Sequence, residues 1–431
     1  MASTLNDPAI WLLALFLLPL LLRVPIAISL GMAAVIVLWK WDKGLAMISF
    51  NFFSGVAKPP LLAIPFFILA GFIMERAGIA RSIINFVQAV TGTVTGGLAV
   101  VAVAVATFWG AVSGSGPATV AALGLILIPG MAQAGYAKDF SAATISVASG
   151  LAIVIPPSIA FIVYGGIANV SVPALFAAGI LPGLLVASFI MLAVLIISKR
   201  HNYHGQASHL SVGQAFREAF WGLLTPLVIL GGIYGGIFTP TEAAAVAVFY
   251  GLFVGIFIYH QITSLKAIFE ILAVSMRSSA VVRIVVTCAG LFSWVATDIG
   301  LVEKSSAFLL SLTDNEWLIL GLINILLLIA GMLLDAISIY YVLLPFLLPI
   351  MAHFHWDPIW FGVIMTVNLA VGQVTPPVAV NLYVGANISG LSMEEISRPA
   401  LPLILAALLA LIVLIAFPAI STFLPNFFGL N

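Results

Sequence analysis

Charged residues are scarce in this sequence, and their scarcity excludes a water-soluble globule. Only 7% of the 431 residues are Asp, Glu, Lys or Arg, whereas soluble domains carry about 25%. Hydrophobic residues make up 63%, and several apolar runs approach the roughly 20 residues that an α-helix needs to cross a bilayer. Short alternating segments typical of a β-barrel are not seen. The composition therefore predicts an all-α integral membrane protein embedded in a lipid bilayer.

Cysteine and excess basic charge are also missing. Cys288 is the only cysteine and lies in an apolar stretch, which excludes a disulfide framework and a cysteine-based metal site. The 15 basic and 15 acidic residues balance, so the sequence offers no basic surface for nucleic acid. Residues 1 to 8 lack the charged start and cleavage site of a signal peptide, so the first apolar run is expected to stay in the mature protein.

An internal repeat divides the sequence into two halves. Pro156-Pro157 and Pro376-Pro377 lie 220 residues apart, and similar residues follow each pair, first Tyr164-Gly165-Gly166 and then Tyr383-Val384-Gly385. Each half fits about five transmembrane helices plus a re-entrant helical hairpin. An odd number of crossings requires opposite orientations, which predicts two inverted repeats.

The predicted organisation follows from this repeat. We expect scaffold helices of repeat 1 in residues 1–60 and the rest of repeat 1 in 61–197, with hairpin 1 at about 97–130 and a broken helix at 155–158. A cytoplasmic connection and the scaffold helices of repeat 2 are expected in 198–260. The rest of repeat 2 is expected in 261–431, with hairpin 2 at about 316–351 and a broken helix at 373–377. This arrangement places most basic residues on the side of Lys199 and Arg200. The positive-inside rule then predicts that side to be cytoplasmic and both termini to be periplasmic, in a bacterial inner membrane.

Four polar, helix-breaking patches occur at membrane depth, two in each half. They are residues 110–119, 155–158, 331–338 and 373–377. Broken helices expose carbonyl oxygens that suit an alkali cation and amide groups that suit a carboxylate. Singly, Gly and Ser can serve helix contacts and Pro can serve a kink, but the symmetric pairing favours a transport site.

Two ionisable residues within apolar stretches are candidates for the chemistry. Asp335 predicts an ion path, since a carboxylate at membrane depth is costly, with a helix cap facing trapped water as the alternative. Arg283 could hold a substrate carboxylate by bidentate hydrogen bonds. Pairing with Asp298 or Asp335, or snorkelling to the interface, are the alternatives for Arg283.

Several motifs together resemble the large membrane subunit of TRAP transporters, the tripartite ATP-independent periplasmic transporters. The resemblance covers essentially the whole chain and lies in Leu62-Ala63-Ile64-Pro65-Phe66-Phe67-Ile68-Leu69-Ala70-Gly71, Ser113-Gly114-Ser115, Ile155-Pro156-Pro157-Ser158, and Thr375-Pro376-Pro377-Val378 with Asn381-Leu382. It implies a sodium-coupled elevator for a small organic acid such as a C4-dicarboxylate, a keto acid or a sugar acid such as sialic acid. It also implies a small four-helix membrane subunit and a periplasmic substrate-binding protein as partners.

The resemblance also implies site residues. Two or more sodium ions would be the coupling ions, with no organic cofactor, and their ligands would be Ser113, Gly114, Ser115, Gly116, Ile155 and Pro156 in the first half and Gly331, Asp335, Val374 and Thr375 in the second. Substrate would lie between the hairpin tips near Ser115, Ser158, Thr375 and Asn381, with Arg283 as the further candidate. Two positions depart from the family pattern. Phe72 stands where many members have an acidic residue, and Arg283 stands where most have an apolar one.

An intramembrane enzyme and a channel are the alternatives. Lipid chemistry usually needs clustered Asp, Glu or His, and Asp335 is the only acidic residue that the sequence places deep in the membrane. A channel gives no reason for paired breaks in inverted halves. The sequence thus favours a transporter with no catalytic residues.

Overall fold

The computed structural model describes residues 7–91, 93–205 and 209–430, and within these ranges it contains helices and no strands. Nine helical segments of the described chain are long and apolar enough to cross a membrane. The all-α membrane architecture predicted from composition is thereby confirmed. The predicted periplasmic termini concern residues 1–6 and 431, which lie outside the described ranges.

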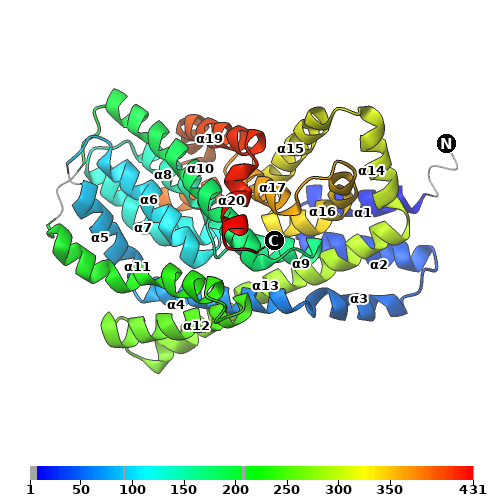
Figure 1. Cartoon of the computed structure of the whole chain (residues 1–431), viewed down its shortest axis with the longest axis horizontal. Coiled ribbons are helices and arrows are strands. Elements are labelled where there is room, and N and C mark those ends of the chain that lie inside the picture. The colour runs from blue at the N-terminus through cyan, green and yellow to red at the C-terminus, as the bar shows by residue number, and fades with distance from the viewer. Residues whose placement is uncertain (1–6, 92, 206–208, 431) are drawn as a thin grey trace.

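The helices follow one another without intervening sheet (Figure 1). The first half contains α1 (Pro8–Leu21), α2 (Ile26–Lys40), α3 (Ala46–Val56), η2 (Pro59–Leu62), α4 (Ala63–Arg76), α5 (Ile79–Thr91), α6 (Gly97–Ser113), α7 (Gly116–Gln133), α8 (Lys138–Ala148), η3 (Ser149–Ile153), α9 (Ile159–Ala168) and α10 (Val172–Arg200). The second half contains α11 (Val212–Tyr234), α12 (Pro240–Phe253), η4 (Val254–Ile258), α13 (Leu265–Asp298), α14 (Leu301–Leu312), α15 (Glu316–Leu333), α16 (Ala336–His353), α17 (Pro358–Gly372), α18 (Val380–Ser389), α19 (Met393–Ala416) and α20 (Ala419–Phe427).

Each half contains one tight helical hairpin and one interrupted helix. The hairpins are α6–α7 and α15–α16, at the places where the sequence predicts hairpins 1 and 2. The interruptions separate η3 from α9 and α17 from α18. Proline lacks an N–H and disfavours α geometry in the residue before it, so each Pro-Pro pair ends the helix that precedes it. Both Pro-Pro bonds are cis.

The two halves interlock around these interruptions. The first-half helices α7 and α8 pack against α18, and α9 packs against α16. The long helix α10 packs against α17, α19 and α20. Figure 1 shows α6, α7, α8, α10 and α19 gathered in one body, with α4, α11 and α12 along its lower side. Neither half therefore forms a separate core.

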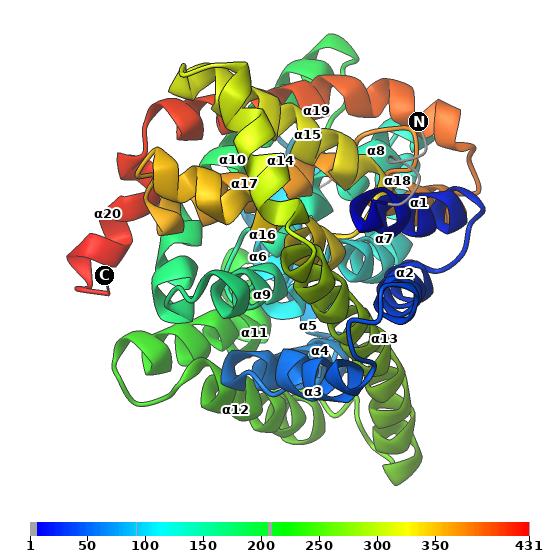
Figure 2. The ribbon, with the colours of Figure 1, turned by 90° about the vertical axis from the view of Figure 1, so that its right-hand side faces the viewer.

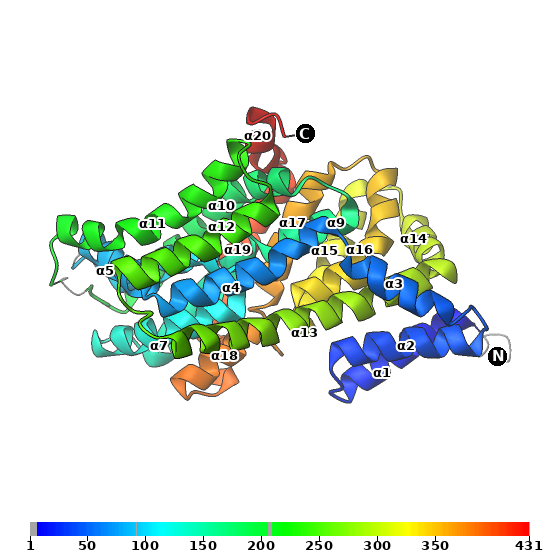
Figure 3. The same cartoon turned by 90° about the horizontal axis from the view of Figure 1, so that it is seen from below.

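Two long arms cross the molecule beside this body. One arm is the continuous 34-residue helix α13, and the other is made by α3, η2 and α4 in succession. Helix α2 packs on α13, and α13 packs on both α3 and α4 (Figures 2 and 3). Pro59-Pro60 interrupts the first arm, because proline cannot continue an α-helix.

Apolar side chains cover much of the outer surface. On α19, Leu401, Leu405, Leu409 and Ile412 are more than half exposed and recur at helical spacing, so they form a stripe along one face. Such a stripe would be unfavourable in water and suits contact with lipid.

Candidate functional site

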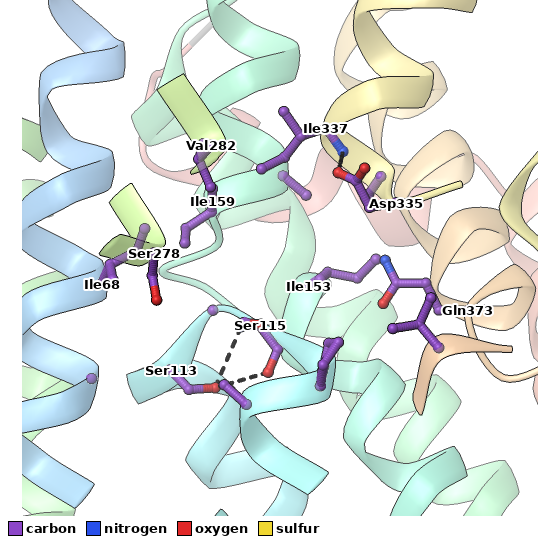
Figure 4. Close-up of a pocket in the computed structure, with 18 of the residues that line it drawn as sticks. Ile68, Ser113, Ser115, Ile153, Ile159, Ser278, Val282, Asp335, Ile337 and Gln373 are labelled. Atoms are coloured by element: carbon purple, nitrogen blue, oxygen red, sulfur yellow. Dashed lines mark hydrogen bonds between the residues drawn. The ribbon is translucent and has the colours of Figure 1, made fainter. Parts of the chain in front are cut away.

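A cavity of about 240 Å³ lies where the two hairpin tips, the two helix interruptions and the two arms meet. Figure 4 shows Ser113 and Ser115 at one end of it, Asp335 and Gln373 along one side, and Ile68, Ser278 and Val282 on the opposite side. Its wall is formed by Ile68, Gly71, Phe72, Glu75, Trp109, Ser113, Gly114, Ser115, Gly116, Pro117, Ala118, Ile153, Ile159, Ala160, Ser278, Val282, Asp335, Ala336, Ile337, Gln373 and Val380.

The tip of hairpin 1 is shaped by Gly114. This residue caps α6 in the left-handed region at φ +60°, a conformation that favours glycine. The hydroxyl groups of Ser113 and Thr119 form a hydrogen bond of 2.6 Å, which connects the two helices of hairpin 1. The backbone of Ser115 is extended, and its side chain makes no capping hydrogen bond with α7. The tip thus presents hydroxyl and backbone oxygens to the cavity.

Hairpin 1 packs against the first interruption. A Cβ on Gly114 would lie 3.5 Å from both the carbonyl oxygen of Pro157 and the backbone nitrogen of Ile159. Ser158 caps the start of α9 and donates a hydrogen bond of 2.5 Å to the carbonyl oxygen of Ile153. Its hydroxyl group therefore holds the interruption in shape behind the cavity wall.

Hairpin 2 packs against the second interruption in the corresponding way. A Cβ on Gly331 would lie 3.0 Å from the Cα of Gly372, so the two backbones are in contact. The backbone nitrogen of Ala379 donates to the carbonyl oxygen of Met332 at 3.4 Å. The hydroxyl group of Thr375 donates a hydrogen bond of 2.6 Å to the carbonyl oxygen of Val371.

Asp335 is the N-cap of α16. Its carboxylate accepts hydrogen bonds from the backbone nitrogens of Ile337 and Ser338, at 3.1 and 3.3 Å, and from the hydroxyl group of Ser338. The side chain is nevertheless exposed to the cavity. Asp335 thus has the helix-capping geometry that the sequence offered as the alternative to an ion path. One carboxylate can both cap a helix and face a cation.

The two halves meet most closely at Gly116. A Cβ on Gly116 would lie 2.7 Å from the side-chain Nδ2 of Asn381 and 3.1 Å from the Oε1 of Gln373, so only glycine fits. Asn381 is fully buried, and its Nδ2 donates to the carbonyl oxygen of Ser146 at 3.4 Å. The Oδ1 of Asn381 and the Oε1 of Gln373 are both buried without a hydrogen-bond partner among the described residues.

The structure gathers some predicted site residues at the cavity and places others behind its wall. Ser113, Gly114, Ser115, Gly116 and Asp335 line the cavity. The residues that lie outside its wall are Ile155, Pro156, Ser158, Gly331, Val374, Thr375 and Asn381. Reasoning from the sequence missed Gln373, Glu75 and Ser278. The polar start of the patch at 373–377 could have singled out Gln373.

Arg283 lies at a different place from the cavity. It borders a small hollow of about 10 Å³ together with Leu61, Ile64, Pro65, Val282 and Val286. Val282 borders both spaces, but Arg283 does not line the larger one. Asp298, one of its suggested partners, pairs instead with Lys43 at 3.1 Å.

The charges around the cavity are all acidic. Glu75 and Asp335 are its charged lining residues, and no Lys, Arg or His lines it in the described part of the chain. A second hollow of about 750 Å³ adjoins it and shares Phe72 and Glu75 as lining residues. Arg76 and Arg81 line this second hollow. The described ranges also hold no group of three or more His, Cys, Asp or Glu side chains suited to a transition metal.

Known proteins resemble this chain over nearly its full length. A family model described as the DctM component of the tripartite ATP-independent periplasmic transporter matches residues 13–420. The isethionate TRAP transporter permease protein DctMQ of Oleidesulfovibrio alaskensis is 39% identical over 421 residues, which cover 97% of this chain and 66% of that protein. The C4-dicarboxylate TRAP transporter large permease protein DctM of Rhodobacter capsulatus is 35% identical, with 98% and 100% covered.

Two further comparisons agree with these. The sialic acid TRAP transporter large permease protein SiaM of Vibrio cholerae is 35% identical over 87% of this chain and 88% of its own length. The crystal structure of the Alcanivorax borkumensis YdaH transporter superposes with a TM-score of 0.66 at 17% identity, covering 96% of this chain and 98% of that one, and so shares the fold. This multi-pass membrane chain thus belongs to the DctM component family of the tripartite ATP-independent periplasmic (TRAP) transporters.

Proposed function

We propose that this chain is the transport subunit of a sodium-coupled, binding-protein-dependent importer of a small organic acid in a bacterial inner membrane. Its named relatives handle isethionate, C4-dicarboxylates and sialic acid, all of them organic acids. The relative fused to its second subunit supports a small membrane partner, and the family description supports a periplasmic binding protein.

The observation that carries the sodium coupling is the charge of the cavity. The cavity is lined by two carboxylates and, among the described residues, by no basic side chain. An organic anion in it would be repelled unless cations bind with it. Sodium prefers oxygen ligands, as other hard cations do. The hairpin tips and interruptions offer them, through the hydroxyl group of Ser113, the Asp335 carboxylate and nearby backbone carbonyls. Bound sodium ions would thus offset the negative charge of the substrate and of the two carboxylates.

The arrangement of the arms and the hairpins supports an elevator mechanism. The cavity has one wall on the arms, at α4 and α13, and the other wall on the hairpins and interruptions. Sliding the hairpin-bearing body along the arms would carry the cavity from one side to the other, with the halves in inverted orientation. Arg76 and Arg81 line the adjoining hollow, and the positive-inside rule would place these basic residues on the cytoplasmic side, so this conformation would be inward-facing.

Uptake into liposomes tests this proposal. The chain is reconstituted with its small membrane subunit and binding protein, and uptake of radiolabelled organic acids is measured with and without an inward sodium gradient. We expect accumulation that requires the gradient and stops when a sodium ionophore collapses it. Accumulation that ignores sodium would refute the coupling and leave proton coupling or facilitated diffusion.

A further inference from the structure

The wall of the cavity is mostly apolar. Eight large apolar side chains line it, namely Ile68, Phe72, Trp109, Ile153, Ile159, Val282, Ile337 and Val380. The wall on the arms carries only the hydroxyl group of Ser278 and the carboxylate of Glu75 as polar side chains. A second anionic group on a substrate would therefore face apolar surface or a carboxylate, and both are costly for a charge.

One side of the cavity carries an unsatisfied polar group, with a second one behind the wall. Gln373 is 5% exposed and lines the cavity, and its Oε1 has no hydrogen-bond partner in the described chain. Asn381 is 0% exposed, touches Gly116 and also has an unpartnered oxygen. A buried polar atom without a partner is uncommon and calls for a ligand or water. Turning the Gln373 amide by half a rotation would present its N–H groups to an anion instead.

The start of a long helix lies beside Gln373. Gly116 is the first residue of the 18-residue helix α7, in which Pro117 has no N–H and the N–H of Thr119 donates to the carbonyl oxygen of Ser115, so Gly116 and Ala118 supply the N–H groups that lack a partner within the helix. The partial positive charge at this end favours an anionic group. Gln373 from the second half and α7 from the first half thus converge on one point of the cavity wall.

The volume limits the size of the ligand. An apolar cavity of about 150 Å³ binds benzene, so a volume near 240 Å³ admits about ten non-hydrogen atoms. A sugar acid of the size of sialic acid would have to extend from this cavity into the adjoining hollow, past Phe72 and Glu75. A short acid with a hydrocarbon body fits within the cavity.

We propose that this cavity takes a monoanion with an apolar body, and that Gln373 is a specificity-determining residue for it. The single carboxylate or sulfonate group sits at Gln373 and the start of α7, and the body packs against Phe72, Ile68 and Val282. This inference rests on the proposed function, since it names the substrate class of the same site. It separates this chain from relatives named for dicarboxylates or for sialic acid.

Thermal unfolding of the purified full-length chain in detergent tests the substrate class. A ligand that binds only the native state raises the midpoint of unfolding. The probes are phenylacetate, hexanoate and 3-methyl-2-oxobutanoate as monoanions, and succinate, fumarate and N-acetylneuraminate as the contrasting acids, each in sodium chloride and in choline chloride. We expect the monoanions to stabilise the chain in sodium chloride at concentrations about tenfold lower than succinate needs.

Each result of the panel has a distinct meaning. Stronger sodium-dependent stabilisation by succinate or N-acetylneuraminate overturns the substrate class and leaves the sodium-coupled transport of acids standing. Equal stabilisation by monoanions and dicarboxylates also overturns the class. No stabilisation by any acid in either salt, for a chain that unfolds cooperatively, overturns the assignment of this cavity to a monoanion, and sodium-coupled transport is then decided by the uptake assay with the partner subunits.

Variants test the role of Gln373. Gln373→Leu should weaken the apparent affinity for the monoanions about tenfold, because a hydrogen bond to a charged group is lost. Gln133→Leu, at the exposed far end of α7, is the matched control and should keep it. Ser278→Arg adds a cation to the wall on the arms and should let succinate bind. Unchanged affinity in Gln373→Leu would overturn the assignment of Gln373.

Discussion

The ammonium group of Lys58 donates a hydrogen bond of 2.7 Å to the carbonyl oxygen of Gly166. Lys58 lies between α3 and η2 on one of the arms, and Gly166 lies in the last turn of α9, the half-helix that follows the first interruption. Carbonyl groups in the last turn of a helix lack partners within the helix and attract cations. The contact thus joins the arm to the body that carries the hairpins.

Lys58→Met should weaken the hold on this conformation. If α9 moves along the arm during transport, this bond has to break in every cycle. Its loss should shift the balance between conformations by about 1 to 2 kcal/mol, roughly a factor of ten. The measurement is the rate of thiol labelling at Ser278→Cys in a Cys288→Ala background, because Ser278 faces the cavity. Lys304→Met, whose ammonium group lies 4.0 Å from Asp7 on the exposed surface, is the control. An unchanged labelling rate in Lys58→Met would show that the bond does not hold the conformation.

Gly372→Ala should separate hairpin 2 from the second interruption. A Cβ on Gly372 would lie 2.7 Å from the Cα of Gly331, a distance that forces the backbones apart. Overpacking of this kind costs about 1 to 3 kcal/mol, and it would displace Asp335, which follows shortly after Gly331. We expect a lower midpoint of thermal unfolding and weaker sodium-dependent uptake.

Gly321→Ala provides the matched comparison for this glycine. Gly321 lies within α15 and no atom of the described residues approaches its Cβ position within 4 Å, so alanine should be tolerated or slightly stabilising there. Equal behaviour of the two variants would contradict the close packing of Gly331 and Gly372.

Asp335→Asn separates the capping role of Asp335 from its charge. Asn caps helices about as well as Asp, so the stability of the chain should hardly change. The negative charge is lost, and if Asp335 helps to bind sodium the sodium concentration for half-maximal uptake should rise at least about tenfold. Uptake as a function of sodium concentration is the measurement.

Asp357→Asn is the control for this substitution. Asp357 caps α17 with the same geometry, accepting from the backbone nitrogens of Ile359 and Trp360 at 2.8 and 2.9 Å, and it does not line the cavity. A sodium dependence that is unchanged in both variants would leave Asp335 with its capping role alone.

Local sequence patterns anticipate the hairpins and interruptions well, because Gly, Ser and Pro act on the backbone where they stand. The Pro-Pro pairs mark both interruptions, and Gly114 marks the turn of hairpin 1 through its positive φ. The meeting of Gly116 with Gln373 is different. It joins two halves distant in the sequence, so no local pattern encodes it. The Pro59-Pro60 pair likewise indicates the break in the first arm, since proline cannot continue an α-helix.

The orientation of a long helix is also beyond a local pattern. On α13, Val282 borders the cavity, whereas the next residue, Arg283, points to another face, since successive residues turn by about 100° around a helix. The depth of Arg283 in an apolar run is readable from the sequence. The face that it occupies depends on how α13 packs against α2, α3, α4 and α16.

Arg283→Leu tests whether this orientation holds through the transport cycle. In the present conformation Arg283 borders the hollow beside Leu61, Ile64 and Pro65, so we expect substrate affinity to stay within about twofold of the parent chain. The measurement is the substrate concentration for half-maximal uptake, with Arg277→Leu on the same helix as the control. A loss of affinity of about tenfold or more in Arg283→Leu alone would mean that the hairpin-bearing body brings the substrate to this guanidinium group in another conformation. The counter-charge role suggested by the sequence would then apply to that conformation, and the cavity described here would be one of two positions of the same site.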